Sequence, residues 1–197
     1  AEDKKLQTLY RLIDEKMTHP INEGNKKLII FSAFATTTNY LYKHISQYVL
    51  YKYGLHTAQI SGTKGFETTL KTNHRDLNSL LTYFSPQSKD RNLLFPDDQR
   101  EIDVLIATDV ISEGQNLQDA DMMVNYDIHW NPVRIIQRFG RVDRIGSKNK
   151  FIQLVNFWPN IELDEYIDLK SRVESRMKIS VLTSTADDNV LSSEEID

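Results

Sequence analysis

The spacing of apolar and polar residues predicts that helices and strands alternate along this chain. Near the start, apolar side chains recur at helical spacing and mark one face of an amphipathic helix. They are Leu6, Leu9, Tyr10, Ile13 and Met17. A turn with Gly24 follows, and residues 27–32 then form a short, nearly continuous apolar run. Such a run is typical of a strand that is buried on both faces of a parallel sheet.

The same patterns predict the remaining elements. Further helices are expected over 40–49, 70–84, 132–144 and 163–177, and further strands over 55–60, 103–108, 121–126 and 151–157. Regular alternation of this kind indicates βαβ units, and therefore an α/β fold with a mainly parallel sheet flanked by helices. We expect residues 1–183 to form one domain and the acidic, Ser-rich residues 184–197 to be a disordered tail.

Composition narrows the classes of protein. The chain has 197 residues, of which 40% are hydrophobic, so it can bury a single core. It contains no cysteine, which excludes a disulfide framework, a cysteine zinc site and a cysteine nucleophile. The five histidines show no metal-ligand spacing, so no metal site is predicted. No apolar run reaches about 18 residues and no secretory signal is visible, so we expect a cytoplasmic protein without a membrane span.

The net charge of −4 hides a strongly basic segment. Five acidic and no basic residues lie within 184–197, and without them the chain carries 24 basic against 23 acidic side chains. Between Arg134 and Lys150, six basic residues face a single acid, Asp143. A binding partner with negative charge is therefore expected at this segment and not over the whole surface.

A helix over 132–144 would separate its basic and apolar residues. Four arginines and a glutamine fall within an arc of roughly 120°, with apolar residues on the other side. The polar set is Arg134, Gln137, Arg138, Arg141 and Arg144. Guanidinium groups stay charged and bind phosphate oxygens in pairs, which suits a polyphosphate or a nucleic-acid backbone. The alternative is a solvated basic face that makes surface ion pairs, although the sequence places few acids nearby.

The loop that precedes this helix also favours an anion site. Thr108 and Asp109 end a predicted strand, and the polar residues 112–116 follow. Ligands of parallel sheets bind beyond the carboxyl ends of the strands, where small residues let backbone N–H groups approach an anion. Taken alone, such residues are also ordinary loop residues.

Taken together, these segments resemble the second RecA-like lobe of superfamily 2 helicases and translocases. ATDVISEGQNLQ at 107–118 is similar to motif V of that family, and QRFGRVDRIG at 137–146 is similar to motif VI. LIIFSAF at 28–34 resembles motif IV. The DIHWNP run at 127–132 is similar to the Swi/Snf branch, and above all to its bacterial RNA-polymerase-associated ATPases. The resemblance covers about residues 4 to 180, in the family's order.

The resemblance implies a three-layer RecA-like domain and a role for individual residues. Arg141 and Arg144 would reach ATP across a cleft as arginine fingers, and Gln137 would join the same network. Gly114 and Asn116 match positions near the nucleotide, while Thr108, Ser32 and Gly62 match positions that touch the nucleic-acid backbone. At position 143 many helicases carry a small residue, whereas this sequence has Asp143. This aspartate could form an ion pair with a neighbouring arginine or take part in the mechanism, and the sequence leaves both alternatives open.

The half of the site that binds ATP is missing from the sequence. No Gly-Lys dipeptide occurs, so no phosphate-binding loop of the form G-x-x-x-x-G-K-[ST] is present. We therefore expect ATP and Mg²⁺ to be bound mainly by an N-terminal RecA-like lobe outside this chain, with DNA or RNA as the second partner. The chain alone should not hydrolyse ATP. The alternative is a RecA-like module that binds nucleic acid or protein without hydrolysis.

Overall fold

A mainly parallel sheet of six strands organises the chain. The computed structural model describes residues 2–62, 65–111, 115–127, 132–139, 141, 148–157, 167, 168, 170–172, 174 and 175. The strands are β1 (Leu28–Phe31), β2 (Thr57–Ser61), β3 (Gly65–Thr68), β4 (Val104–Ala107), β5 (Met122–Asn125) and β6 (Gln153–Asn156). Their order in the sheet is β3-β2-β4-β1-β5-β6. Only the β2–β3 pair is antiparallel, so the predicted α/β class is confirmed.

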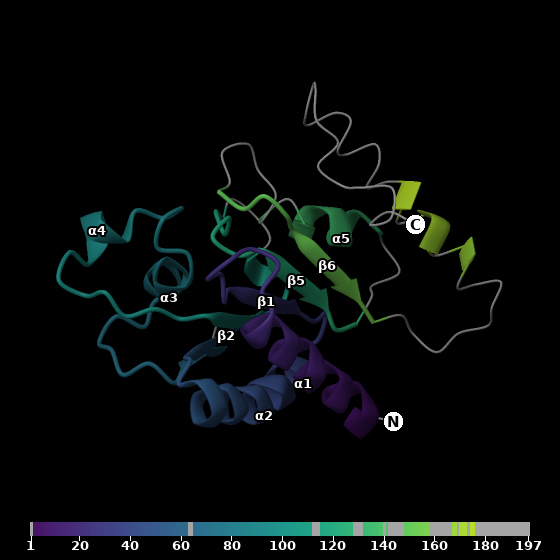
Figure 1. Ribbon diagram of the computed structural model, residues 1–197, viewed down its shortest axis with the longest axis horizontal. Coiled ribbons are helices and arrows are strands. Elements are labelled where there is room, and N and C mark those ends of the chain that lie inside the picture. Colours follow the sequence, from purple (N-terminus) through teal and green to yellow (C-terminus); the bar gives the residue numbers. More distant parts are fainter. Residues whose placement is uncertain are drawn as a thin grey trace.

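Helices cover both faces of this sheet and give three layers (Figure 1). The helical elements are α1 (Glu2–Thr18), α2 (Ala35–Tyr53), α3 (Leu77–Phe84), α4 (Arg91–Leu94), the 3-10 turn η1 (Asp109–Ile111) and α5 (Pro132–Phe139). Figure 1 shows α1 and α2 on one side of the strands and α3 and α5 on the other. The described residues between 167 and 175 are helical, within the last predicted helix. The predicted tail at 184–197 lies outside the described residues.

Alternation along the strands divides the core in two. In β1, Leu28 and Ile30 join the cluster formed with α1 and α2, whereas Ile29 and Phe31 join the cluster formed with α3 and α5. All four side chains are fully buried. Because successive strand residues point to opposite faces, an apolar run without polar interruption is needed for a sheet covered on both sides.

Two features between residues 62 and 84 differ from the prediction. The strand β3 was not predicted; it returns against β2 through a turn in which Gly62 has a φ of +61°, a conformation that favours glycine. The helix expected over 70–84 begins only at Leu77, because the Asp76 side chain accepts a hydrogen bond of 3.2 Å from the Ser79 N–H and caps it. Leu70 is buried without being helical.

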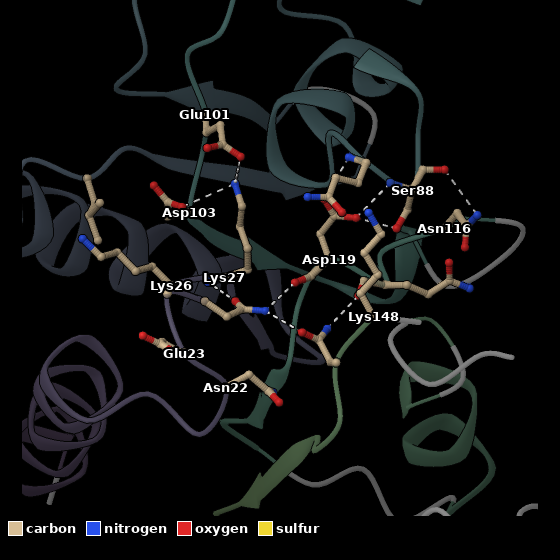
Figure 2. A pocket seen from close by; sticks show the side chains of 16 residues that line it. Asn22, Glu23, Lys26, Lys27, Ser88, Glu101, Asp103, Asn116, Asp119 and Lys148 are labelled. Carbon is tan, nitrogen blue, oxygen red and sulfur yellow. Dashed lines mark hydrogen bonds and ion pairs between the residues drawn. The ribbon is translucent and has the colours of Figure 1, made fainter. Parts of the chain in front are cut away.

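The amino ends of the strands surround a polar pocket of about 810 Å³ (Figure 2). Most of its lining comes from segments that precede strands: 22–27 before β1, 55 before β2, 101 and 103 before β4, 116, 118 and 119 before β5, and 148 and 149 before β6. Gln87 and Ser88, from the turn after α3, complete it. The carboxyl ends of the strands lie at the opposite edge. The amino ends and the carboxyl ends of the strands therefore form two separate surfaces, and each surface is made by several of the loops that connect strands and helices.

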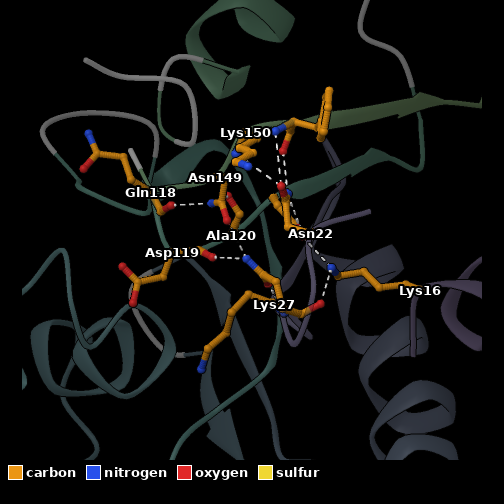
Figure 3. Close-up of polar contacts among 11 residues, drawn as sticks. Lys16, Asn22, Lys27, Gln118, Asp119, Ala120, Asn149 and Lys150 are labelled. Carbon is orange, nitrogen blue, oxygen red and sulfur yellow. Dashed lines mark hydrogen bonds and ion pairs between the residues drawn. The ribbon is translucent and has the colours of Figure 1, made fainter. Parts of the chain in front are cut away.

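A buried ion pair fastens α1 to the amino edge. The Lys16 ammonium donates to the Asp121 carboxylate just before β5 and, over 2.9 Å, to the Asn25 carbonyl. The Lys16 and Asp121 side chains are 2% and 0% exposed. Burial lowers the pKa of Lys16, against the opposing effect of the carboxylate. Asn22 donates to the same carboxylate over 2.9 Å and contacts the chain before β6 (Figure 3).

Within the described part of the chain, no helix combines the length and the apolar character that a membrane crossing requires.

The fold predicts a large cost for breaking this buried pair. We expect Lys16→Met to lower the free energy of unfolding by about 3 kcal/mol, because Asp121 would remain buried without its cation. Urea unfolding followed by circular dichroism measures the change. The matched control is Lys4→Met, an exposed lysine of the same helix, which should change stability by less than about 0.5 kcal/mol. Equal stability of the two variants would contradict this assignment.

Candidate nucleotide and nucleic-acid site

The helix α5 is anchored by a buried arginine. Arg138 is 0% exposed, and its guanidinium donates to both carboxylate oxygens of Asp109, over 2.5 and 2.9 Å. It donates a further hydrogen bond of 3.0 Å to the Asn125 side chain and lies 5.1 Å from the Phe31 ring centroid. The bidentate pair joins α5 to the start of η1, and the bond to Asn125 joins it to the end of β5.

Asp109 also holds Arg134, one turn earlier on α5. The Arg134 guanidinium donates to Asp109 over 3.2 Å, and its side chain is 46% exposed. Burial alone would raise the pKa of Asp109, but the hydrogen bonds and charge of Arg138 and Arg134 outweigh it and hold the pKa below the ordinary value of 3.8. Asp109 is therefore a carboxylate shared between two cations.

These contacts correct the prediction of one open row of arginines. Arg138 does not present its guanidinium to a ligand, because the acid that neutralises it is brought from the end of β4, 29 residues earlier. The helix also ends at Phe139, short of the predicted Arg144. Arg134 and Gln137 lie on the exposed side of α5, as expected.

Arg141 lies in a turn that directly follows α5, and both of its backbone groups are fixed. Its N–H donates to the Arg138 carbonyl over 3.1 Å, and its carbonyl accepts a hydrogen bond of 3.1 Å from the Leu117 N–H. The Arg141 residue is half-buried. The structure thus brings the segment resembling motif VI against the segment resembling motif V.

Asn116, one residue before Leu117, carries a buried acceptor. Its side-chain nitrogen donates to the Ser88 carbonyl over 3.5 Å, whereas its side-chain oxygen has no hydrogen-bond partner among the described residues. A buried polar atom without a partner is uncommon and indicates a place for a ligand or water. Asn116 also lines the amino-edge pocket.

The residues predicted to touch nucleic acid share the carboxyl edge of the sheet. Ser32, Gly62 and Thr108 follow β1, β2 and β4, which are neighbours in the sheet. Gly62 is exposed and Thr108 half-buried. Ser32 differs, because its buried hydroxyl donates to the Asp127 carboxylate, which also accepts from the Ala33 N–H over 2.7 Å. A contact between Ser32 and nucleic acid stays a prediction, and its observed role is to hold Asp127.

Three residues singled out in the sequence, Gly114, Asp143 and Arg144, lie outside the described residues. In the described part of the chain, no three histidine or carboxylate side chains gather as a metal site would require.

Sequence reasoning missed the carboxylates that hold the loops. Asp109, Asp119 and Asp127 each bind groups far away in the sequence, and none was assigned a structural contact. The available signal was position: Asp109 and Asp127 each lie two residues after the end of a strand, where a carboxylate can meet backbone N–H groups or a neighbouring helix.

Three features together define a RecA-like lobe. They are the mainly parallel sheet, the helical layers on its two faces, and the contact between the turn of Arg141 and the loop of Asn116 and Leu117. Residues 4–146 match the model of the helicase conserved C-terminal domain, and the chain belongs to that family. It is 31% identical over 147 residues to the uncharacterized ATP-dependent helicase YqhH of Bacillus subtilis, covering 75% of this chain and 21% of that protein. The chain therefore spans about a fifth of that relative's length.

A second relative supports the predicted Swi/Snf-type branch. The RNA polymerase-associated protein RapA of Pectobacterium atrosepticum is 38% identical over 66 residues, which is 34% of this chain and 7% of that protein. The resemblance to the bacterial RNA-polymerase-associated group is thereby confirmed.

Solved structures confirm the fold. The C-terminal part of the Fun30 ATPase domain aligns with a TM-score of 0.54 and 19% identity, covering 84% of this chain and 44% of that one. Saccharomyces cerevisiae Dbp5 L327V, solved with RNA and ADP BeF3, aligns with a TM-score of 0.55 and 21% identity, covering 89% and 37%.

The ion pairs of Asp109 predict unequal effects for its two arginines. We expect Arg138→Met to lower the free energy of unfolding by about 3 kcal/mol, because it removes a buried, bidentate partner. Arg134→Met breaks a half-exposed contact with the same carboxylate and should lower it by less than about 1 kcal/mol. Thermal and urea unfolding of the two variants measure the difference. Arg134→Met as damaging as Arg138→Met would show that Arg138 is not the anchor.

Proposed function

We propose that this chain is the second motor lobe of an ATP-dependent nucleic-acid helicase or translocase. It would supply arginine fingers to ATP held by a first lobe and would grip the nucleic-acid backbone. The observation that carries the proposal is the hydrogen bond from Leu117 to Arg141, which seats the arginine beside the loop of Asn116. Membership of the helicase C-terminal family and relatives named as ATP-dependent helicases support it.

On the nucleotide side, the residues of this chain fit an anionic ligand that carries hydroxyl groups. Arg141 brings a permanent positive charge to a turn whose backbone is fixed. Asn116 offers a buried oxygen that can accept a hydrogen bond from a sugar hydroxyl. ATP bound with Mg²⁺ by the first lobe would supply the phosphoryl group that is transferred to water. Arg141, together with Arg144, would stabilise the negative charge that develops there.

The remaining predicted nucleotide contacts complete this proposal. Gln137, exposed on α5, would join the arginines, and Gly114 would let the loop approach the nucleotide closely. Without a first lobe, this chain would not hydrolyse ATP. We assign the assembled motor to the cytoplasm.

On the nucleic-acid side, the carboxyl edge would bind the backbone. Thr108 and Gly62 follow neighbouring strands there, and Arg134 contributes a half-exposed guanidinium at the start of α5. Backbone contacts of this kind position the strand but carry little base information. We therefore propose a lobe that holds DNA or RNA without sequence preference.

The arginine-finger role predicts a specific loss of turnover. In a protein that joins this lobe to its first lobe, Arg141→Ala should lower nucleic-acid-stimulated ATP hydrolysis by about 10³-fold or more, with unchanged thermal stability. Steady-state phosphate release measures turnover. The control is Arg11→Ala, an exposed arginine of α1 on the opposite face. Unchanged turnover in Arg141→Ala would refute the role. Absence of hydrolysis in the unmutated two-lobe protein would favour the binding module without hydrolysis.

The proposed backbone grip predicts salt-dependent binding by the chain itself. A short labelled single strand of DNA or RNA should bind with an affinity that falls as salt rises, and similarly for unrelated base sequences. Arg134→Ala should weaken binding and reduce the salt slope by about 1, because one phosphate contact is lost. Fluorescence anisotropy measures both quantities, with Arg11→Ala as the control. An unaltered slope in Arg134→Ala would remove this residue from the interface.

A further inference from the structure

The carboxylate of Asp119 makes several of the hydrogen bonds between the turn after α3 and the loop that leads into β5. Asp119 accepts hydrogen bonds from the N–H groups of Gln87 and Ser88, both over 2.9 Å, and from the Ser88 hydroxyl over 2.5 Å. In return, the Asp119 N–H donates to the hydroxyl of Ser85 over 3.3 Å, and Ser85 is fully buried. Charge-assisted bonds to two consecutive backbone N–H groups fix both the position and the orientation of the loop.

The other end of the same loop is attached to the same turn. Asn116 donates to the Ser88 carbonyl over 3.5 Å, and the Lys89 ammonium donates to the Gln115 side chain over 3.1 Å. Figure 2 shows Ser88 between Asp119 and Asn116. Residues 115–119 are therefore held at both ends by residues 85–89.

Leu117, in the middle of the loop, connects the loop to Arg141. Leu117 is fully buried in the core, and its N–H donates to the Arg141 carbonyl over 3.1 Å. Ala120 closes a turn back onto the Leu117 carbonyl, also over 3.1 Å. A shift of the loop would therefore move the acceptor side of the Arg141 peptide, while its N–H remains bonded to α5.

We propose that Asp119 and the turn at 85–89 form a clamp that positions Arg141 and Asn116 for the reaction. Asp119 is a positioning residue in this proposal, since it acts through Leu117 and touches no reacting atom. The proposal rests on the function proposed above. It adds a third segment to the site. The turn at 85–89 belongs to neither the segment resembling motif V nor the one resembling motif VI, and it sets how these two are positioned relative to each other.

The irregular backbone of the loop favours a clamp over a passive surface contact. The loop 115–120 connects η1 to β5 and contains no helix or strand of its own among the described residues. Its backbone is therefore held by the side-chain contacts of Gln115, Asn116 and Asp119 and by the backbone hydrogen bonds of Leu117. Arginine fingers act only when their geometry is held closely, because small misplacements reduce the rate strongly.

Amide hydrogen exchange in this chain tests the clamp directly. In Asp119→Ala, exchange at the Leu117 N–H should become about tenfold faster, because the loop loses its charged anchor. The matched control is Asp14→Ala. Asp14 also accepts from three donors, the hydroxyls of Tyr48 and Tyr53 and the ammonium of Lys52, but it lies between α1 and α2 on the opposite face. Asp14→Ala should leave Leu117 exchange unchanged.

Turnover in the two-lobe protein tests the positioning role. Asp119→Ala should lower kcat about tenfold with little change in the KM for ATP, and Asp119→Asn, which keeps one acceptor oxygen, should recover part of the loss. If Asp119→Ala does not fold, Ser85→Ala replaces it in both measurements, since it removes only the acceptor of the Asp119 N–H.

Three outcomes would overturn the clamp: unchanged Leu117 exchange, equal acceleration in Asp14→Ala, or faster exchange with normal kcat while Arg141→Ala is inactive. Normal turnover in Arg141→Ala would instead show that the proposed function itself has failed.

Discussion

The charge of Arg138 can be buried at the centre of this lobe because Asp109 accepts two hydrogen bonds from it. That pair ties α5 to the end of β4, and Asn125 adds a tie to β5. The position of Arg141 depends on this pair, because the Arg141 N–H donates to the Arg138 carbonyl. An uncompensated guanidinium would have to leave the core. The helix and the turn beyond it would then lose their place on the sheet.

The proposed nucleic-acid site and the proposed nucleotide site lie at different places on the sheet. Residues at the carboxyl ends of β2 and β4 would meet nucleic acid, whereas the loop before β5 and the turn after α5 would meet the nucleotide. Asp109 and Leu117 belong to the same crossover between β4 and β5, so one stretch of chain connects the two places. If the proposed function holds, this arrangement would couple nucleic-acid binding directly to the nucleotide site.

Local patterns predicted most of the fold. The apolar runs and helical stripes placed every parallel strand and the principal helices, because burial on one or two faces leaves a periodic trace in the sequence. The edge strand β3 left no such trace, and its turn depends on one glycine. The contacts around the candidate site could be predicted only in part. Family-like motifs singled out Arg141 and Asn116 as candidates, but the partners of Arg138 and Asn116 come from segments 29 and 28 residues away. Contacts between residues so far apart in the sequence are set by the topology of the fold and cannot be predicted from the local spacing of residue types.

The attachment of α1 has a consequence for how the chain folds. The buried lysine of this helix meets a carboxylate 105 residues later in the chain, and Asn22, four residues beyond the helix, donates to the carbonyl of Phe151, 129 residues later. Contacts of such high sequence separation form late, after the cost of closing a long loop has been met. We therefore expect the polar contacts that fasten α1 to the amino edge to form only after β5 and the segment before β6 have been synthesised. Until then, the place of α1 on the sheet depends on its apolar contacts with β1 and α2, which lie close to it in the sequence.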